Sequence, residues 1–238
     1  KRKVLIFIFL LAITFALPLM FVGLFLSTWH SLSELWLKMD YGYSHGFVAL
    51  GLGLIAAYHN QTKLLNLEPK PSTLAMISLA GASLTWFIAD YLQIQVGTQL
   101  TLVSIMFLTL ASLFGSKIAV GQTVPLLYLL FVIPVWDYLN PALLWLTTSV
   151  ATNVLELSGL AVFIEGNRIT TPYGVVEIAG GCAGLRYFLV SLTLVLYYSQ
   201  QRTNTLRTTA ALFVIAMAFG LIANWTRVIS LILIGYQS

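Results

Sequence analysis

The only cysteine of the chain, Cys182, lies in the sequence GGCAGLR, between a pair of glycines and an arginine. A free cysteine usually behaves as a small buried hydrophobe, and glycines are also common where helices pack closely. The chemical alternative is a nucleophile, because the amides at a helix start favour a thiolate. Arg186, four residues later, would then share a helical face with the thiol. The motif by itself leaves both interpretations open.

A second group of polar residues lies in the last apolar segment, where the sequence LIANWTRVISL contains Asn224 and Arg227. An arginine inside an apolar span is costly and indicates a function, with snorkelling of the side chain to the interface as the alternative. The two residues are three positions apart, so one helix face presents an amide and a permanent cation. A thiol near a permanent cation is a candidate nucleophile.

His45, in the sequence YGYSHGF, is the remaining candidate. A single histidine at an interface is more often a structural group than a base, but beside tyrosines it would shape a substrate groove. The single cysteine, the three histidines and the separated carboxylates show no spacing typical of metal ligands. The sequence therefore predicts neither a metal nor another cofactor. The net charge of +4 is scattered along the chain, which argues against nucleic acid as a partner.

The composition determines what surrounds these residues. Of the 238 residues, 59% are hydrophobic and 8% are charged, whereas soluble domains carry about 25% charged residues. Lipid must therefore be the solvent for most of the protein, and a spanning helix needs about 20 apolar residues. The sequence predicts an all-α polytopic membrane protein with seven spans at residues 4–27, 42–58, 72–92, 96–114, 118–135, 183–199 and 208–235, the last of which is long enough to tilt or break near Gly220.

The positions of Lys and Arg predict the orientation in the membrane. With a cytoplasmic N-terminus, eight of the twelve cationic residues lie on the cytoplasmic side and four on the outer side. The eight are Lys1, Arg2, Lys3, Lys63, Lys70, Lys117, Arg202 and Arg207, and the four are Lys38, Arg168, Arg186 and Arg227. The first span lacks a small-residue cleavage site, so we expect a retained anchor.

The longest connection, residues 136–182, is expected on the outer side. Its first part, residues 141–161, opens with Pro141 and predicts a helix at the outer membrane interface. Its second part alternates β-branched and polar residues between turn residues, which predicts a short hairpin of two strands. The hairpin leads to Cys182 at the outer end of the sixth span. The sixth and seventh spans are expected to pack as an antiparallel pair.

Taken together, the motifs YSHGF, GGCAGLRYF and ANWTRVISL resemble those of the exosortase/archaeosortase family, and most of all the bacterial exosortases. The resemblance extends from about residue 40 to the end of the chain. It implies a single transmembrane domain over residues 1–238 in the bacterial inner membrane, with the active site on the periplasmic side. It also implies a cysteine transpeptidase that cleaves C-terminal sorting tails (PEP-CTERM-like) of exported, membrane-anchored proteins and transfers those proteins to a glycan or lipid acceptor.

The resemblance also implies roles for individual residues. Cys182 matches the nucleophile that forms a thioester, and Arg227 matches the essential arginine. Arg186 matches a less universal arginine, while Asn224 and His45 would be supporting residues. The third catalytic residue of the family, a histidine or arginine, lies in a further span. An eighth span is therefore expected beyond the C-terminus shown, and the sequence is expected to be truncated.

Two other functions stay open from the residues alone. A non-catalytic multispan component of exopolysaccharide export or assembly would use Arg227 and Asp90 as charges along a pathway and would need no thiol. An intramembrane protease would use Cys182 for hydrolysis alone, without transfer to an acceptor.

Overall fold

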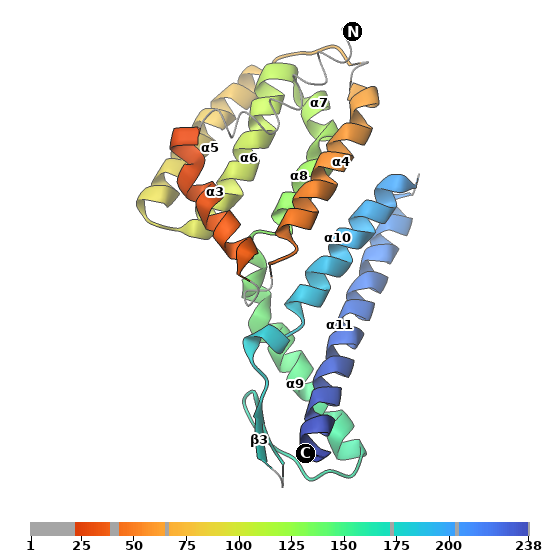
Figure 1. The fold of residues 1–238 in the computed structure, drawn as a ribbon. Helices are drawn as coiled ribbons and strands as arrows, with labels where there is room; N and C mark the ends of the chain where they lie inside the picture. Colours follow the sequence, from red (N-terminus) through yellow and green to blue (C-terminus); the bar gives the residue numbers. More distant parts are fainter. Residues whose placement is uncertain (1–21, 39–42, 65–66, 172–173, 203–204, 238) are drawn as a thin grey trace. The chain divides into compact units, whose positions relative to one another are not determined.

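The computed structural model describes residues 22–38, 43–64, 67–171, 174–202 and 205–237. The chain divides into two compact units, one of residues 1–39 and 43–134 and the other of residues 40–42 and 135–238. Helices make up most of both units (Figure 1). The prediction of a single transmembrane domain over residues 1–238 stays a prediction.

The first unit contains six described helices (Figure 1). They are α3 (Val22–Leu37), α4 (Gly46–Leu64), α5 (Thr73–Tyr91), α6 (Gln95–Phe114), α7 (Ser116–Gly121) and α8 (Thr123–Leu130). Helix α5 begins after Ser72, whose hydroxyl accepts a hydrogen bond from the amide of Ala75 at 3.3 Å. Helices α5 and α6 pack as a hairpin, and α3 packs against α6.

Polar contacts join α3 to α5 in this unit. The indole nitrogen of Trp86 donates to Thr28 Oγ1 at 3.2 Å, and the Trp86 ring meets Phe25 edge to face, with ring centroids 4.8 Å apart. Near the end of α5, Asp90 accepts a hydrogen bond from Ser27 Oγ at 3.2 Å. Asp90 is the carboxylate that the alternative function in exopolysaccharide export would use, and it is hydrogen-bonded to α3.

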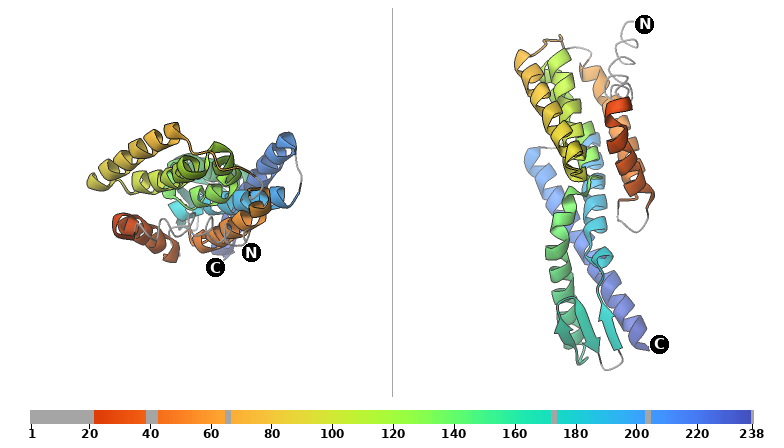
Figure 2. Two further views of the ribbon diagram at one scale, coloured as in Figure 1. Left: turned by 90° about the horizontal axis from the view of Figure 1, so that it is seen from above. Right: turned by 90° about the vertical axis from the view of Figure 1, so that its left-hand side faces the viewer.

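The second unit contains three long helices and a sheet. A 3-10 helix, η3 (Pro134–Leu139), leads into α9 (Asn140–Leu157). After the sheet, the 3-10 turn η4 (Gly180–Cys182) leads to α10 (Leu185–Gln201) and α11 (Leu206–Gln237). Helices α10 and α11 lie side by side in the views of Figures 1 and 2, which confirms the expected pairing of these two segments.

The close approach of α10 and α11 depends on Gly220. A Cβ atom at this position would lie 2.8 Å from Ser191 Oγ and 3.1 Å from the carbonyl oxygen of Tyr187. Helix α11 runs without a break through Gly220, so the expected alternative of a break there is wrong. The glycine instead provides the space that the facing helix occupies, as is common where membrane helices pack.

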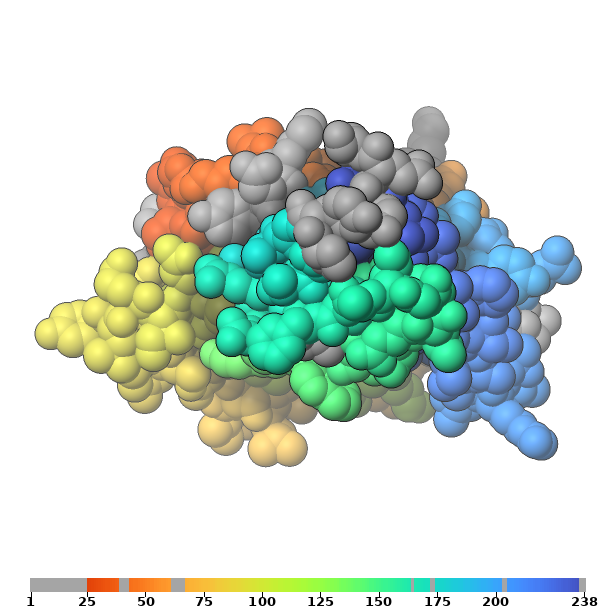
Figure 3. All heavy atoms as spheres, turned by 90° about the horizontal axis from the view of Figure 1, so that it is seen from below, coloured from red at the N-terminus to blue at the C-terminus, as the bar shows by residue number. Residues whose placement is uncertain are grey.

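The sheet has three antiparallel strands in the order β1 (Phe163–Glu165), β2 (Arg168–Thr171) and β3 (Gly174–Glu177). The prediction of a two-stranded hairpin was wrong because residues 174–177 pair with the second edge of β2. An exposed ion pair between Arg168 Nε and Glu177, 3.1 Å apart, joins β2 to β3. Seen from below, the strands and the end of α9 lie together on one face (Figure 3).

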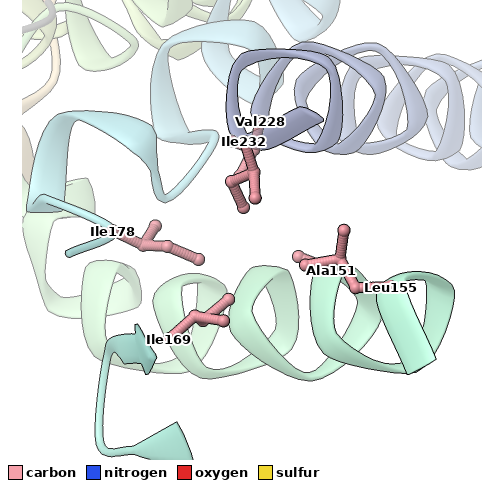
Figure 4. Packing of buried hydrophobic residues seen from close by; sticks show 6 residues of the cluster. All are labelled: Ala151, Leu155, Ile169, Ile178, Val228 and Ile232. Atoms are coloured by element: carbon pink, nitrogen blue, oxygen red, sulfur yellow. The ribbon is translucent and has the colours of Figure 1, made fainter. Parts of the chain in front are cut away.

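Six buried residues form the apolar core that joins the sheet to two helices. They point toward a common centre in Figure 4 and are Ala151, Leu155, Ile169, Ile178, Val228 and Ile232. The first pair comes from α9 and the last pair from α11, and in each pair the residues are four positions apart, on one helix face. Ile169 lies on β2, and Ile178 directly follows β3. Burial of these side chains holds the sheet against α9 and α11.

Four helical segments in the described part of the chain are long and apolar enough to cross a membrane. They are Thr73–Tyr91, Gln95–Phe114, Gly180–Gln201 and Leu206–Gly235, and they confirm the spans expected at 72–92, 96–114, 183–199 and 208–235. The interrupted apolar stretch from Thr123 to Leu157 makes five if it is counted as one span.

The other three expected spans are not confirmed. Most of the span expected at residues 4–27 lies outside the described residues. The one expected at 42–58 corresponds to α4, whose apolar part, Gly46–Asn60, is shorter than a full span. The one expected at 118–135 is divided between α7 and α8 and ends before Pro134, which has no amide proton to continue a helix.

We expect Gly220→Leu to lower the free energy of unfolding in detergent by about 1 to 3 kcal/mol, because the new side chain overpacks the contact with α10. Gly235→Leu on the same helix is the matched control, since no atom lies within 4 Å of its Cβ position. Thermal unfolding of the two variants measures the difference. Equal melting temperatures would contradict a close contact at Gly220.

Candidate active site

Cys182 occupies the last position of the 3-10 turn η4, three residues before α10 begins. Its amide donates to the carbonyl oxygen of Ala179 at 2.8 Å, and the amide of Ala183 donates to that of Gly180 at 3.1 Å. The thiol is free and half-buried, and the side chain packs against the apolar core of this unit. The prediction that Cys182 lies where a turn leads into a helix is confirmed.

The expectation that Cys182 and Arg186 share a helical face was wrong. The spacing argument requires one continuous helix through both residues, but α10 begins at Leu185. Gly184 lies between them with φ of +101°, in the left-handed region, so the turn and the helix follow different paths. Arg186 is exposed in the first turn of α10, and its role in the site stays a prediction.

Asn224 joins α11 to the turn that carries Cys182. Its side chain is fully buried, and its Nδ2 donates to the carbonyl oxygen of Cys182 at 2.8 Å. A Cβ atom at Gly184 would lie 3.0 to 3.3 Å from the side-chain atoms of Asn224. The motifs GGCAGLR and ANWTR therefore meet at this hydrogen bond, with Gly184 leaving the space for the amide.

The acceptor of the same side chain, Oδ1, has no partner in the described part of the chain. Asn224 Oδ1 is buried, and among the described residues it makes no hydrogen bond. The atom of the amide that faces the carbonyl oxygen of Cys182 must be the donor Nδ2, so the other atom is the acceptor Oδ1. A buried acceptor without a donor is costly, and functional sites are common places for such groups.

Thr147 on α9 is a site residue that the sequence did not indicate. Its side chain is fully buried, and its hydroxyl donates to the carbonyl oxygen of Ala183 at 3.1 Å. The available signal was the helical spacing of Thr147, Thr148, Ala151 and Thr152, which share the buried face of α9. That pattern predicts a face packed against protein, but it does not identify which carbonyl the hydroxyl meets.

Arg227 borders the face of α11 that packs against the turn. It follows Asn224 by three residues and directly precedes Val228 of the apolar core. Its side chain is exposed, and within the described part of the chain no hydrogen bond or ion pair of its guanidinium group is found. The structure thus confirms that Asn224 and Arg227 lie on one helix.

His45 belongs to the first unit, directly before α4. Its ring stacks on that of Tyr43 with centroids 6.3 Å apart, and its carbonyl oxygen accepts a hydrogen bond from the amide of Ala49 at 2.9 Å. A role for His45 in the site stays a prediction.

As to metals, the described residues contain no group of three or more His, Cys, Asp or Glu side chains that could hold an ion.

A family model described as transmembrane exosortase matches residues 36–238. The chain belongs to the transmembrane exosortase family. The match covers most of the chain and includes all five predicted site residues, which are His45, Cys182, Arg186, Asn224 and Arg227. Together with the apolar helices, it shows that this exosortase-family protein is a multi-pass membrane protein. A search of curated proteins and a search of solved structures find no match to it.

We expect Gly184→Ala to destabilise the protein by about 1 to 3 kcal/mol, because an L-residue is strained at this positive φ. The added methyl group would also press on the amide of Asn224. Gly181→Ala, in the same turn, is the control, since no atom lies within 4 Å of its Cβ position. Thermal unfolding in detergent compares the two. A Gly184→Ala variant as stable as Gly181→Ala would contradict this account of the turn.

Proposed function

We propose that this protein is a membrane cysteine transpeptidase that cleaves C-terminal sorting tails of exported proteins through a thioester on Cys182. The observation that carries the proposal is the hydrogen bond from Asn224 to the carbonyl oxygen of Cys182. It joins the turn that bears the thiol to the helix that bears Arg227. Membership of the exosortase family supports the same chemistry, because that family consists of membrane cysteine transpeptidases.

In the proposed reaction, the sulfur of Cys182 attacks the carbonyl carbon of the scissile peptide bond. The tetrahedral intermediate collapses with cleavage of the C–N bond, and the proton of the thiol ends on the leaving amine. The acyl group stays on sulfur as a thioester, so one difficult step becomes two easier ones. An amine or hydroxyl of the acceptor then attacks the thioester and restores the thiol.

Arg227 acts electrostatically in this proposal. Its guanidinium group is a positively charged donor of hydrogen bonds, so it stabilises the thiolate and the charge of the tetrahedral intermediate. Its exposure and the lack of a partner among the described residues support this role. Amides at the start of α10 provide the oxyanion hole, since the first amides of a helix have no partner within it.

We place the protein in the bacterial inner membrane with seven spans, a cytoplasmic N-terminus and the active site on the periplasmic side. The excess of Lys and Arg on the predicted cytoplasmic side supports this orientation. Residues 136–182 then form the periplasmic loop, with α9 at the interface. The substrate is a tail made of a short PEP-CTERM-like motif, a membrane span and a basic cluster. It enters between the spans, and the acceptor is a glycan or a lipid.

The second candidate is a non-catalytic component of exopolysaccharide export, for which Arg227 and Asp90 would be the pathway charges. The bond from Ser27 to Asp90 satisfies that carboxylate in part and weakens this alternative. Such a component needs no thiol, so the effect of substituting Cys182 distinguishes the two functions. Transfer to an added nucleophile separates a transpeptidase from a protease that only hydrolyses.

We expect Cys182→Ala to abolish cleavage of a tailed reporter protein in cells, because no other thiol exists in the chain. Mass spectrometry of the wild-type protein should find the reporter attached to Cys182 through a thioester, which hydroxylamine cleaves. Ser149→Ala is the control, since the hydroxyl of Ser149 is exposed and bonds within its own helix. Continued processing by Cys182→Ala would refute the proposed function.

We expect Arg227→Gln to lower the rate of cleavage by about 100-fold, the cost of losing one group that stabilises an oxyanion. Arg227→Lys keeps the charge and should lose less. Arg207→Gln, an exposed position in the first turn of the same helix, is the matched control. The initial rates of reporter cleavage measure these effects, and equal rates for the Arg227 and Arg207 variants would exclude Arg227 from the reaction.

A further inference from the structure

The peptide group between Ala183 and Gly184 is held in one orientation. Its carbonyl oxygen accepts the hydrogen bond from Thr147 Oγ1 at 3.1 Å. The described residues contain no cis peptide bond, and in a trans peptide the N–H points away from the C=O. The amide of Gly184 is therefore directed away from Thr147 and α9. The orientation of this amide depends on a hydroxyl 36 residues earlier in the chain than the carbonyl group that it binds.

After Cys182, the first backbone amide that makes no hydrogen bond within the turn is that of Gly184. The amides of Cys182 and Ala183 bond to carbonyl oxygens at Ala179 and Gly180. The first bond of α10 runs from Phe188 to the carbonyl oxygen of Gly184, at 3.0 Å. For the amide of Gly184 itself no partner is found in the described part of the chain, although the residue is buried. A buried amide without an acceptor is rare and costly.

Asn224 provides an independent sign that this place receives a ligand. Its buried Oδ1 has no donor among the described residues, and its side chain lies against Gly184. As far as the described residues show, the site thus contains one donor and one acceptor without a partner. A substrate backbone carries groups of both kinds, so a carbonyl oxygen and an N–H from different peptide groups of the substrate would satisfy them.

We propose that Thr147 is a positioning residue for the reaction of Cys182, and that it orients the amide of Gly184 toward the oxyanion of the tetrahedral intermediate. This inference rests on the proposed function. Thr147 does not touch the substrate. Its hydroxyl holds the Ala183 carbonyl, so the opposite end of that peptide group keeps the direction that the developing charge requires. The positive φ of Gly184 allows this orientation, which residues with a side chain rarely adopt.

The neighbouring residue Thr148 offers a matched control. It is also buried on α9, but its hydroxyl donates to the carbonyl oxygen of Leu144 in its own helix, at 2.9 Å. Thr147→Val and Thr148→Val remove the same atom from adjacent buried positions, and each replaces the hydroxyl with a methyl group of similar size. Only the first change releases the Ala183 carbonyl. Thr147→Ser restores the hydroxyl and should restore the function.

The test uses the full-length protein in detergent with a reporter that carries a tail encoded in the same genome. We expect Thr147→Val to lower kcat by about 10- to 100-fold with little change in KM, because the oxyanion donor is misaligned only slightly. Thr147→Ser and Thr148→Val should stay close to wild type. Alkylation of Cys182 by iodoacetamide should be unchanged in all variants, since this displacement forms no tetrahedral oxyanion.

Three results for kcat would overturn the inference. They are a wild-type kcat in Thr147→Val, an equal loss in Thr148→Val, or a loss that Thr147→Ser does not restore. A parallel fall in the rate of iodoacetamide alkylation would also overturn it, because the thiol itself would then have moved. If the wild-type protein shows no cleavage that depends on Cys182, the proposed function fails. Active wild-type protein with an equally active Thr147→Val variant refutes only the role of Thr147.

Discussion

The hydrogen bond from Asn224 Nδ2 to the carbonyl oxygen of Cys182 is the interaction on which the candidate site depends. It connects residues 42 positions apart, and the side chain of Asn224 that donates it is fully buried. Its net contribution to stability is about 0.5 to 1.5 kcal/mol, but leaving either buried group unpaired costs about 1 to 3 kcal/mol. The main effect of the bond is therefore to disfavour other arrangements of the turn against α11, in which these groups would be unpaired. Its contribution to the stability of the fold is smaller.

Two glycines make this bond possible. Gly220 lets α11 approach α10 at Tyr187 and Ser191, and one turn later Asn224 fills the space beside Gly184. The same face of α11 continues to Val228 and Ile232, which pack with α9 and the sheet. The site is thus built on helices whose positions are fixed by close packing. Groups held this way keep their geometry better than groups on loops.

The polar side chains that bind the turn of Cys182 are fixed dipoles. Thr147 and Asn224 hold two successive carbonyl groups of the turn, and Arg227 follows Asn224 by three residues on α11. In a chain with 8% charged residues that is surrounded largely by lipid, such groups act in a medium that screens charge weakly. The proposed reaction therefore depends on preorganised groups near the thiol, and it needs no titrating base for stabilising the oxyanion.

The sequence by itself determined the features that depend on local composition and spacing. Apolar runs located four spans, turn residues located the start of the helix after Cys182, and a spacing of three put Asn224 and Arg227 on one helix. Only the tertiary structure decided which groups meet. The left-handed Gly184 ends the turn of Cys182 before the helix that carries Arg186 begins, and the partner of Thr147 is a carbonyl group 36 residues away. Residue type does not show a backbone angle or a distant partner, because both result from the packing of segments far apart in the chain.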